Sequence, residues 1–103
     1  MKKIDVRPYN VIVNGHEEPY LVADSLVAVL FNQSLRLSAL DARKNDKIAQ
    51  KIESATDFVL LEEAEYQTLK ECADSFRGYA RNDLEFVDRI ANAEEVEIVE
   101  KGA

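Results

Sequence analysis

The sequence has few of the residues that most often carry chemistry, with one cysteine, one histidine and three glycines among 103 residues. The single cysteine, Cys72, excludes an intramolecular disulfide, so the composition does not point to an oxidising compartment. One cysteine and one histidine also fall short of the roughly four ligands of a structural zinc site. The glycines are scattered and form no phosphate-binding loop. We therefore expect neither a metal nor a cofactor.

The two residues with catalytic potential lack suitable neighbours in the sequence. His16 lies beside Glu17 and Glu18 next to a predicted turn, without a nearby nucleophile or second ligand. Cys72 is close to Glu71 and to a further acid, whose negative charge raises the pKa of a thiol. We interpret His16 as a solvated turn residue and Cys72 as an inert thiol, and predict that the protein is not an enzyme.

Long apolar runs are also missing. The longest, residues 26–31, is far shorter than the roughly 20 residues of a membrane-spanning helix. The N-terminal residues lack the apolar stretch of a signal peptide. We therefore expect a cytoplasmic protein that does not bind membranes.

Acidic residues outnumber basic ones. The chain has 20 acidic and 13 basic residues, and its net charge is -7. Such a charge favours solubility and repels nucleic-acid phosphates and anionic lipids. We expect a protein partner and no direct binding of nucleic acid.

The composition is that of a globular protein, because 47% of the residues are hydrophobic. The patterns described below predict a single α+β domain over residues 1–103. Asn14 and Gly15 tolerate the positive φ angles of a tight turn, so residues 9–13 and the segment after the turn are predicted to form a β-hairpin. Pro19 has no backbone N–H and places its strand at a sheet edge. Residues 3–7 are expected to extend the first strand, with a break at Pro8.

The rest of the chain predicts about four helices and two more strands. Asp24 is a suitable helix N-cap, although the valine-rich run after it is also consistent with a strand. The predicted helices lie between Asp24 and Asn32 and at residues 39–55, 62–76 and 83–92. The predicted strands lie near residues 58–61 and 96–99, and complete a small sheet of about four strands.

A spacing of 38 or 39 residues relates two halves of the chain. Ala42-Arg43 and Ala80-Arg81 match at 38, as do Ile52 and Ile90. One interpretation is a duplicated strand-helix-helix unit followed by a closing strand. The other is that any two such segments share apolar periodicity and common residues.

Three surface features are candidates for binding. Arg77, Arg81 and Arg89 form either a basic patch with interleaved aromatic residues or a solvated segment with local ion pairs. The acidic residues after position 93 either imitate the phosphates of a nucleic acid or protect a sheet edge from aggregation. Leu35 and Leu37, between two predicted helices, add more apolar surface than we expect one small core to cover, so an exposed patch is predicted there. The candidate interface residues are Leu35, Leu37, Phe76, Tyr79, Glu95, Glu97 and Glu100.

Three stretches of the chain, YNVIVNG, VLLEEAEY and RNDLEFV, lie at residues 9–15, 59–66 and 81–87. The chain resembles the small hypothetical proteins of tailed bacteriophage and prophage genomes in these stretches. The resemblance implies a phage assembly, adaptor or host-interference protein, and transfers no functional residue.

Three functions remain as hypotheses. The first is a non-enzymatic protein-interaction module that self-associates. The second is an acidic inhibitor, or DNA mimic, that occupies a basic groove on a host nucleic-acid-binding protein. The third is an enzyme or small-molecule binder, which requires a pocket around His16 or around an acid–tyrosine pair such as Glu65 and Tyr66.

Overall fold

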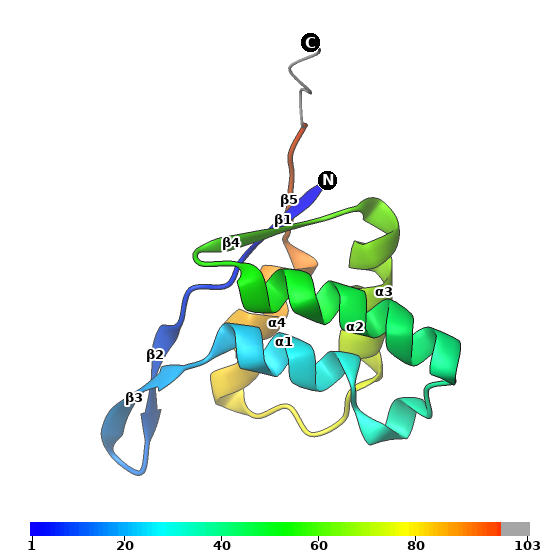
Figure 1. Cartoon of the computed structure of the whole chain (residues 1–103). Helices are drawn as coiled ribbons and strands as arrows, with labels where there is room; N and C mark the ends of the chain where they lie inside the picture. The colour runs from blue at the N-terminus through cyan, green and yellow to red at the C-terminus, as the bar shows by residue number, and fades with distance from the viewer. Residues whose placement is uncertain (98–103) are drawn as a thin grey trace.

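The fold is α+β, as predicted, and is seen in a computed structural model that describes residues 1–97 (Figure 1). The strands are β1 (Lys2–Asp5), β2 (Tyr9–Val13), β3 (His16–Tyr20), β4 (Phe58–Leu61) and β5 (Glu94–Glu95). The helices are α1 (Val22–Leu30), α2 (Ala39–Ser54), α3 (Glu63–Ser75) and α4 (Leu84–Ala91). Short 3-10 turns, η1 (Gln33–Leu35) and η2 (Arg81–Asp83), precede α2 and α4.

The strands form two sheets instead of the single sheet that was expected. One sheet has the order β4-β1-β5, with both neighbours antiparallel to β1, and the other is the hairpin β2-β3. Residues 3–7 do not extend the hairpin. Pro8 cannot donate a ladder hydrogen bond, and it separates β1 from β2. The chain can therefore place β1 in the centre of the other sheet.

The hairpin prediction is confirmed. Asn14 and Gly15 have φ angles of 52° and 80°, the left-handed conformation of a two-residue turn. Pro19 lies in β3, which has one hydrogen-bonded neighbour and is therefore an edge strand.

Local signals located most helix ends correctly. The Ser38 side chain accepts a hydrogen bond from the backbone N–H of Asp41 and caps α2. A capping box between Glu62 and Glu65 begins α3. The N-cap predicted for α1 was wrong by three residues, because the N-cap is Leu21, and Asp24 lies in the first turn, where the helix dipole favours its charge.

The closing strand also begins earlier than predicted. Glu94 and Glu95 pair with β1, and the Val96 N–H donates to the Met1 carbonyl. Val96 and Glu97 are not part of a strand, and residues 98–99 of the predicted strand lie outside the described part of the chain.

The core lies between the helices and one face of the three-stranded sheet. Ile4, Val59 and Leu61 point from the sheet into this core, where all four helices contribute buried side chains. None of the helices described by the structure is long and apolar enough to cross a membrane. The order strand-helix-helix occurs twice, as predicted, but β3 and β4 belong to different sheets. The duplication itself remains a hypothesis.

Candidate protein interface

Strand β4 has a free edge. The Val6 N–H donates to the Asp57 carbonyl at 2.9 Å, directly beyond the register in which Asp5 lies opposite Phe58. Opposed residues of antiparallel strands alternate between hydrogen-bonded and non-hydrogen-bonded pairs. Phe58 and Leu60 are therefore the non-hydrogen-bonded positions toward β1, so their N–H and C=O groups point away from the sheet. No group of residues 1–97 forms a backbone hydrogen bond with them.

The side chains at this edge are apolar and exposed. Phe58 is 40% exposed and Leu60 is 39% exposed, because alternate residues of β4 point to the sheet face opposite the core. On this face Phe58 lines a hollow together with Asp88 and Arg89 of α4. Two cations of the N-terminal segment flank the Phe58 ring, with Lys3 Nζ 4.2 Å and the Arg7 guanidinium 4.9 Å from its centroid. The edge therefore combines unpaired backbone groups with an apolar surface.

A groove of about 600 Å³ is lined by residues of β4 and α2. These two elements lie next to each other in the fold (Figure 1). The strand wall of the groove contains Phe58 and Leu60, and its helix wall contains Lys47 and Lys51. Lys51 Nζ lies 2.6 Å from Glu65 Oε1, which closes one part of the groove. Lys47 forms no ion pair within residues 1–97. The helix wall is thus positively charged.

The charge continues along the exposed face of α2. Arg43, Lys47 and Lys51 are four residues apart, and Lys44 lies three residues before Lys47, so these exposed side chains share one side of the helix. A second hollow of about 870 Å³ shares Lys47 with the groove and continues to the 78% exposed Leu40. We call this face of α2 together with the edge of β4 the α2–β4 surface.

The other strand edges described here are less suited to pairing. Strand β3 contains Pro19 and two glutamates, which discourage the addition of a strand. The carbonyl of Ile12 in β2 accepts a hydrogen bond from Asn82 Nδ2. Strand β5 consists of two glutamates. Strand β2 also exposes apolar side chains, with Ile12 at 62% and Val13 at 37%, but the exposed side chains of β4 line a groove beside α2.

Four of the candidate interface residues of the sequence are half-buried. Leu35, Phe76 and Tyr79 are half-buried against the core, and the Tyr79 hydroxyl donates to the Ala73 carbonyl. Leu37 is half-buried in the connection before α2. Packing of the helices decides this burial, and the pattern of the sequence did not reveal it.

One carboxylate of the predicted acidic row is engaged in ion pairs. Glu95 lies 3.2 Å from Lys2 Nζ, and this hydrogen bond lowers the pKa of Glu95. Glu97 is exposed beyond β5, and Glu100 lies outside the described residues. Glu95 is therefore paired within the protein, and the DNA-mimic hypothesis stays a prediction.

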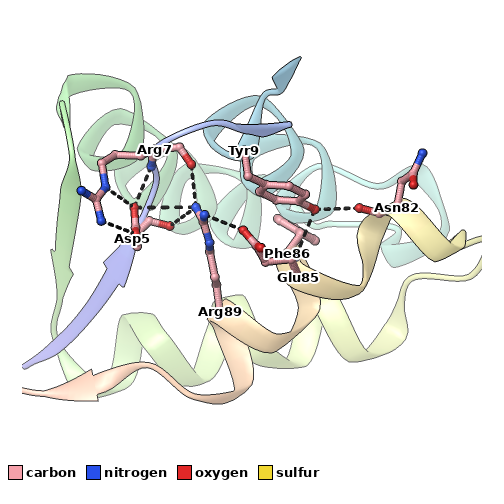
Figure 2. A network of polar contacts seen from close by, with 7 residues as sticks. All are labelled: Asp5, Arg7, Tyr9, Asn82, Glu85, Phe86 and Arg89. Atoms are coloured by element: carbon pink, nitrogen blue, oxygen red, sulfur yellow. Dashed lines mark hydrogen bonds and ion pairs between the residues drawn. The ribbon is translucent and has the colours of Figure 1, made fainter. Parts of the chain in front are cut away.

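The three arginines of the predicted basic patch are also separated in role. Arg77 and Arg81 are exposed, whereas Arg89 is the centre of a polar network that joins α4 to the segment after β1 (Figure 2). Arg89 donates to the Arg7 carbonyl at 2.6 Å and to Glu85 at 2.6 Å, and lies 3.6 Å from Asp5. The local ion pairs that were the alternative to a patch are present for Arg89.

The network in Figure 2 makes the free energy of unfolding depend on pH in the acidic range. Hydrogen bonds from the Arg7 side chain lower the pKa of Asp5 from 3.8 to about 2, with a smaller effect of Arg89. Because the folded-state pKa is the lower one, the contribution of Asp5 is complete above pH 3.8 and is lost as the pH falls toward 2. We expect Asp5→Asn to lower the free energy of unfolding by about 1–2 kcal/mol at pH 7. Urea titrations should show that this difference shrinks at pH 2.5; an equal difference at both pH values would contradict the assignment.

No catalytic arrangement is found among the described residues. His16 is exposed in the hairpin, which contradicts the version of the enzyme hypothesis that required it to be buried. Tyr66 is buried and donates to the Ile90 carbonyl, whereas Glu65 binds Lys51, so these two do not act as a pair. Burial raises the pKa of the Cys72 thiol. Within residues 1–97 no group of three or more acids, histidines or cysteines is placed to hold a metal ion.

Hydrogen exchange tests the free edge directly. We expect the amides of Phe58 and Leu60 to exchange roughly 100-fold faster than those of Val59 and Leu61, which face β1. Amide exchange followed by NMR at low protein concentration measures this. Equal protection of the four amides would show that the edge of β4 is already occupied.

Comparison with known proteins shows no relative. No family model, no curated protein and no solved structure gives a significant match to the chain.

Proposed function

We propose that the protein is a small, non-catalytic interaction module that acts in the cytoplasm and binds a segment of another protein as an additional strand on β4. The observation that supports this proposal is the free edge of β4. There Phe58 and Leu60 have backbone groups that are unpaired within residues 1–97, and their exposed apolar side chains lie beside an open groove. Strand addition uses backbone hydrogen bonds for affinity and neighbouring pockets for specificity. The resemblance to small phage and prophage proteins supports a role in phage assembly or as an adaptor.

The physical chemistry of the edge favours an occupant. Phe58 and Leu60 offer four backbone groups, and a typical intramolecular hydrogen bond contributes about 0.5–1.5 kcal/mol net. An apolar strand edge without proline or lysine is also a template for unwanted aggregation. A specific partner would satisfy the backbone groups and cover both side chains.

A different protein fits the site better than a second copy of this chain. If β4 paired with β4 of another copy, the α2 helices of both would approach the same joint. Their lysines at positions 47 and 51 would then repel each other. We therefore propose a different protein as the occupant. The self-association predicted from the sequence stays a prediction, which sedimentation experiments can test.

The variant Leu60→Pro tests the proposal. Proline at position 60 removes an N–H that points away from β1, so it blocks the free edge without removing a hydrogen bond of the β1–β4 pair. A display library of random 12-residue peptides is selected on the wild-type protein, and enriched peptides are measured by fluorescence polarisation. We expect Leu60→Pro to weaken their binding at least about 30-fold, which corresponds to the loss of about 2 kcal/mol.

Two variants serve as controls. Leu60→Val keeps the backbone N–H and an apolar side chain, and should bind the same peptides within about threefold. Leu84→Lys changes an exposed leucine on α4, away from the groove, and should bind like the wild type. Circular dichroism confirms that each variant is folded. Peptides that bind Leu60→Pro as tightly as wild type, or a library without enriched peptides, would contradict the proposal.

A further inference from the structure

We infer that the segment bound on β4 alternates apolar and acidic residues, and that Lys47 recognises the acids. This inference rests on the proposed function and specifies the chemistry of the partner. The reason is that the two faces of a strand added to the free edge would meet different surroundings.

The outer face of an added strand meets apolar surface. Successive side chains of a strand point to opposite faces of the sheet, so residues opposite Phe58 and Leu60 lie on the face opposite the core. There they contact the exposed parts of these two side chains. This face favours valine, isoleucine or an aromatic residue at every second position of the partner.

The inner face of an added strand meets α2. Residues next to Val59 point toward the helix layer, where the groove is bounded by Lys47, Gln50 and Lys51. Lys51 is already compensated by Glu65, whereas Lys47 has no ionic partner within residues 1–97. Arg43 and Lys44 lie one turn away in the neighbouring hollow, where cations outnumber the one acid, Asp46. A carboxylate at the intervening positions of the partner would therefore be attracted.

The local charge differs in sign from that of the whole molecule. The protein has a net charge of -7, but the helix wall of the groove is cationic and its one acid, Glu65, is engaged by Lys51. At an ionic strength of about 0.15 M, charges act over roughly 8 Å. The charge of the groove, and not the net charge of the protein, therefore decides whether acidic or basic peptides bind more tightly.

Three synthetic peptides test the inference. Each has nine residues with valine at alternate positions, and the positions between hold glutamate, glutamine or lysine. We expect the glutamate peptide to bind about tenfold more tightly than the lysine peptide at 0.1 M salt, with the glutamine peptide between them, and the differences to shrink at 0.5 M salt. Lys47→Glu should reduce or reverse this order. Arg77→Glu makes the same charge change at an exposed position away from the groove, and should leave the order unchanged.

The outcomes separate this inference from the proposed function. If all three peptides bind wild type equally and Leu60→Pro abolishes their binding, the acidic preference is wrong and strand addition stands. If enriched library peptides bind without alternation, the inference also fails. If Leu60→Pro does not weaken any peptide, the proposed function itself fails. A dimer that forms in sedimentation experiments with wild type but not with Leu60→Pro would identify a second copy as the occupant and overturn both.

Discussion

Replacing Asn45 with aspartate is expected to lower the free energy of unfolding by about 3–5 kcal/mol at pH 7, because an unpaired charge would be buried. Asn45 is 2% exposed, and its Nδ2 donates to the Leu30 carbonyl at 2.8 Å. Leu30 is the last residue of α1, where carbonyls lack partners within the helix. A carboxylate cannot donate this hydrogen bond, and it adds negative charge at the negative end of the helix dipole.

The pH dependence distinguishes the charge from the loss of the amide. Burial raises the pKa of a carboxyl at this position above its unfolded value, so the destabilisation is largest at neutral pH and shrinks as the pH falls toward about 4. Asn45→Leu leaves the Leu30 carbonyl unpaired without adding a charge, and should lose about 1–3 kcal/mol at any pH. Urea unfolding at pH 7 and pH 4 measures both variants. Equal losses in the two variants at pH 7 would show that the site tolerates the charge.

Replacing Phe86 with alanine should lower the free energy of unfolding by about 3–5 kcal/mol, because it leaves a cavity where three parts of the fold meet. Phe86 is 1% exposed, and its ring centroid lies 5.9 Å from Tyr20 and 6.3 Å from Tyr79. Its backbone N–H donates to the Tyr9 hydroxyl. The Tyr9 and Tyr20 rings are stacked at 4.7 Å, so the loss of Phe86 removes the surface on which the base of the hairpin rests.

This substitution should also affect the hairpin more than the three-stranded sheet. An isolated two-stranded hairpin is marginally stable in water, so β2 and β3 depend on their contacts with α4. We expect amide protection in β2 to fall more than protection in β1, as measured by hydrogen exchange. Leu84→Ala changes an exposed residue of the same helix and should change stability by less than about 0.5 kcal/mol. Similar losses in the two variants would contradict this role of Phe86.

The candidate interface was only partly predictable. The segment 58–61 was expected as a buried strand, and its sequence shows no difference between the buried Val59 and the exposed Phe58. The lysines of α2 were visible as part of a charged helix, but their position beside β4 was not. The helical period of α2 was a signal for part of this surface, since Arg43, Lys47 and Lys51 recur every four residues and lie outside the buried face.

The sequence by itself determined the features that depend on neighbouring residues. Asn14 and Gly15 produce the hairpin turn because both adopt positive φ. Ser38 and Glu62 begin α2 and α3 because their side chains accept hydrogen bonds from free N–H groups. Pro8 separates two strands because it has no N–H. Only the tertiary structure decided that β1 lies between β4 and β5, and hence which backbone groups of Phe58 and Leu60 remain unpaired. Strand pairing joins residues more than 50 positions apart, and its register depends on the packing of the whole core, which no local pattern contains.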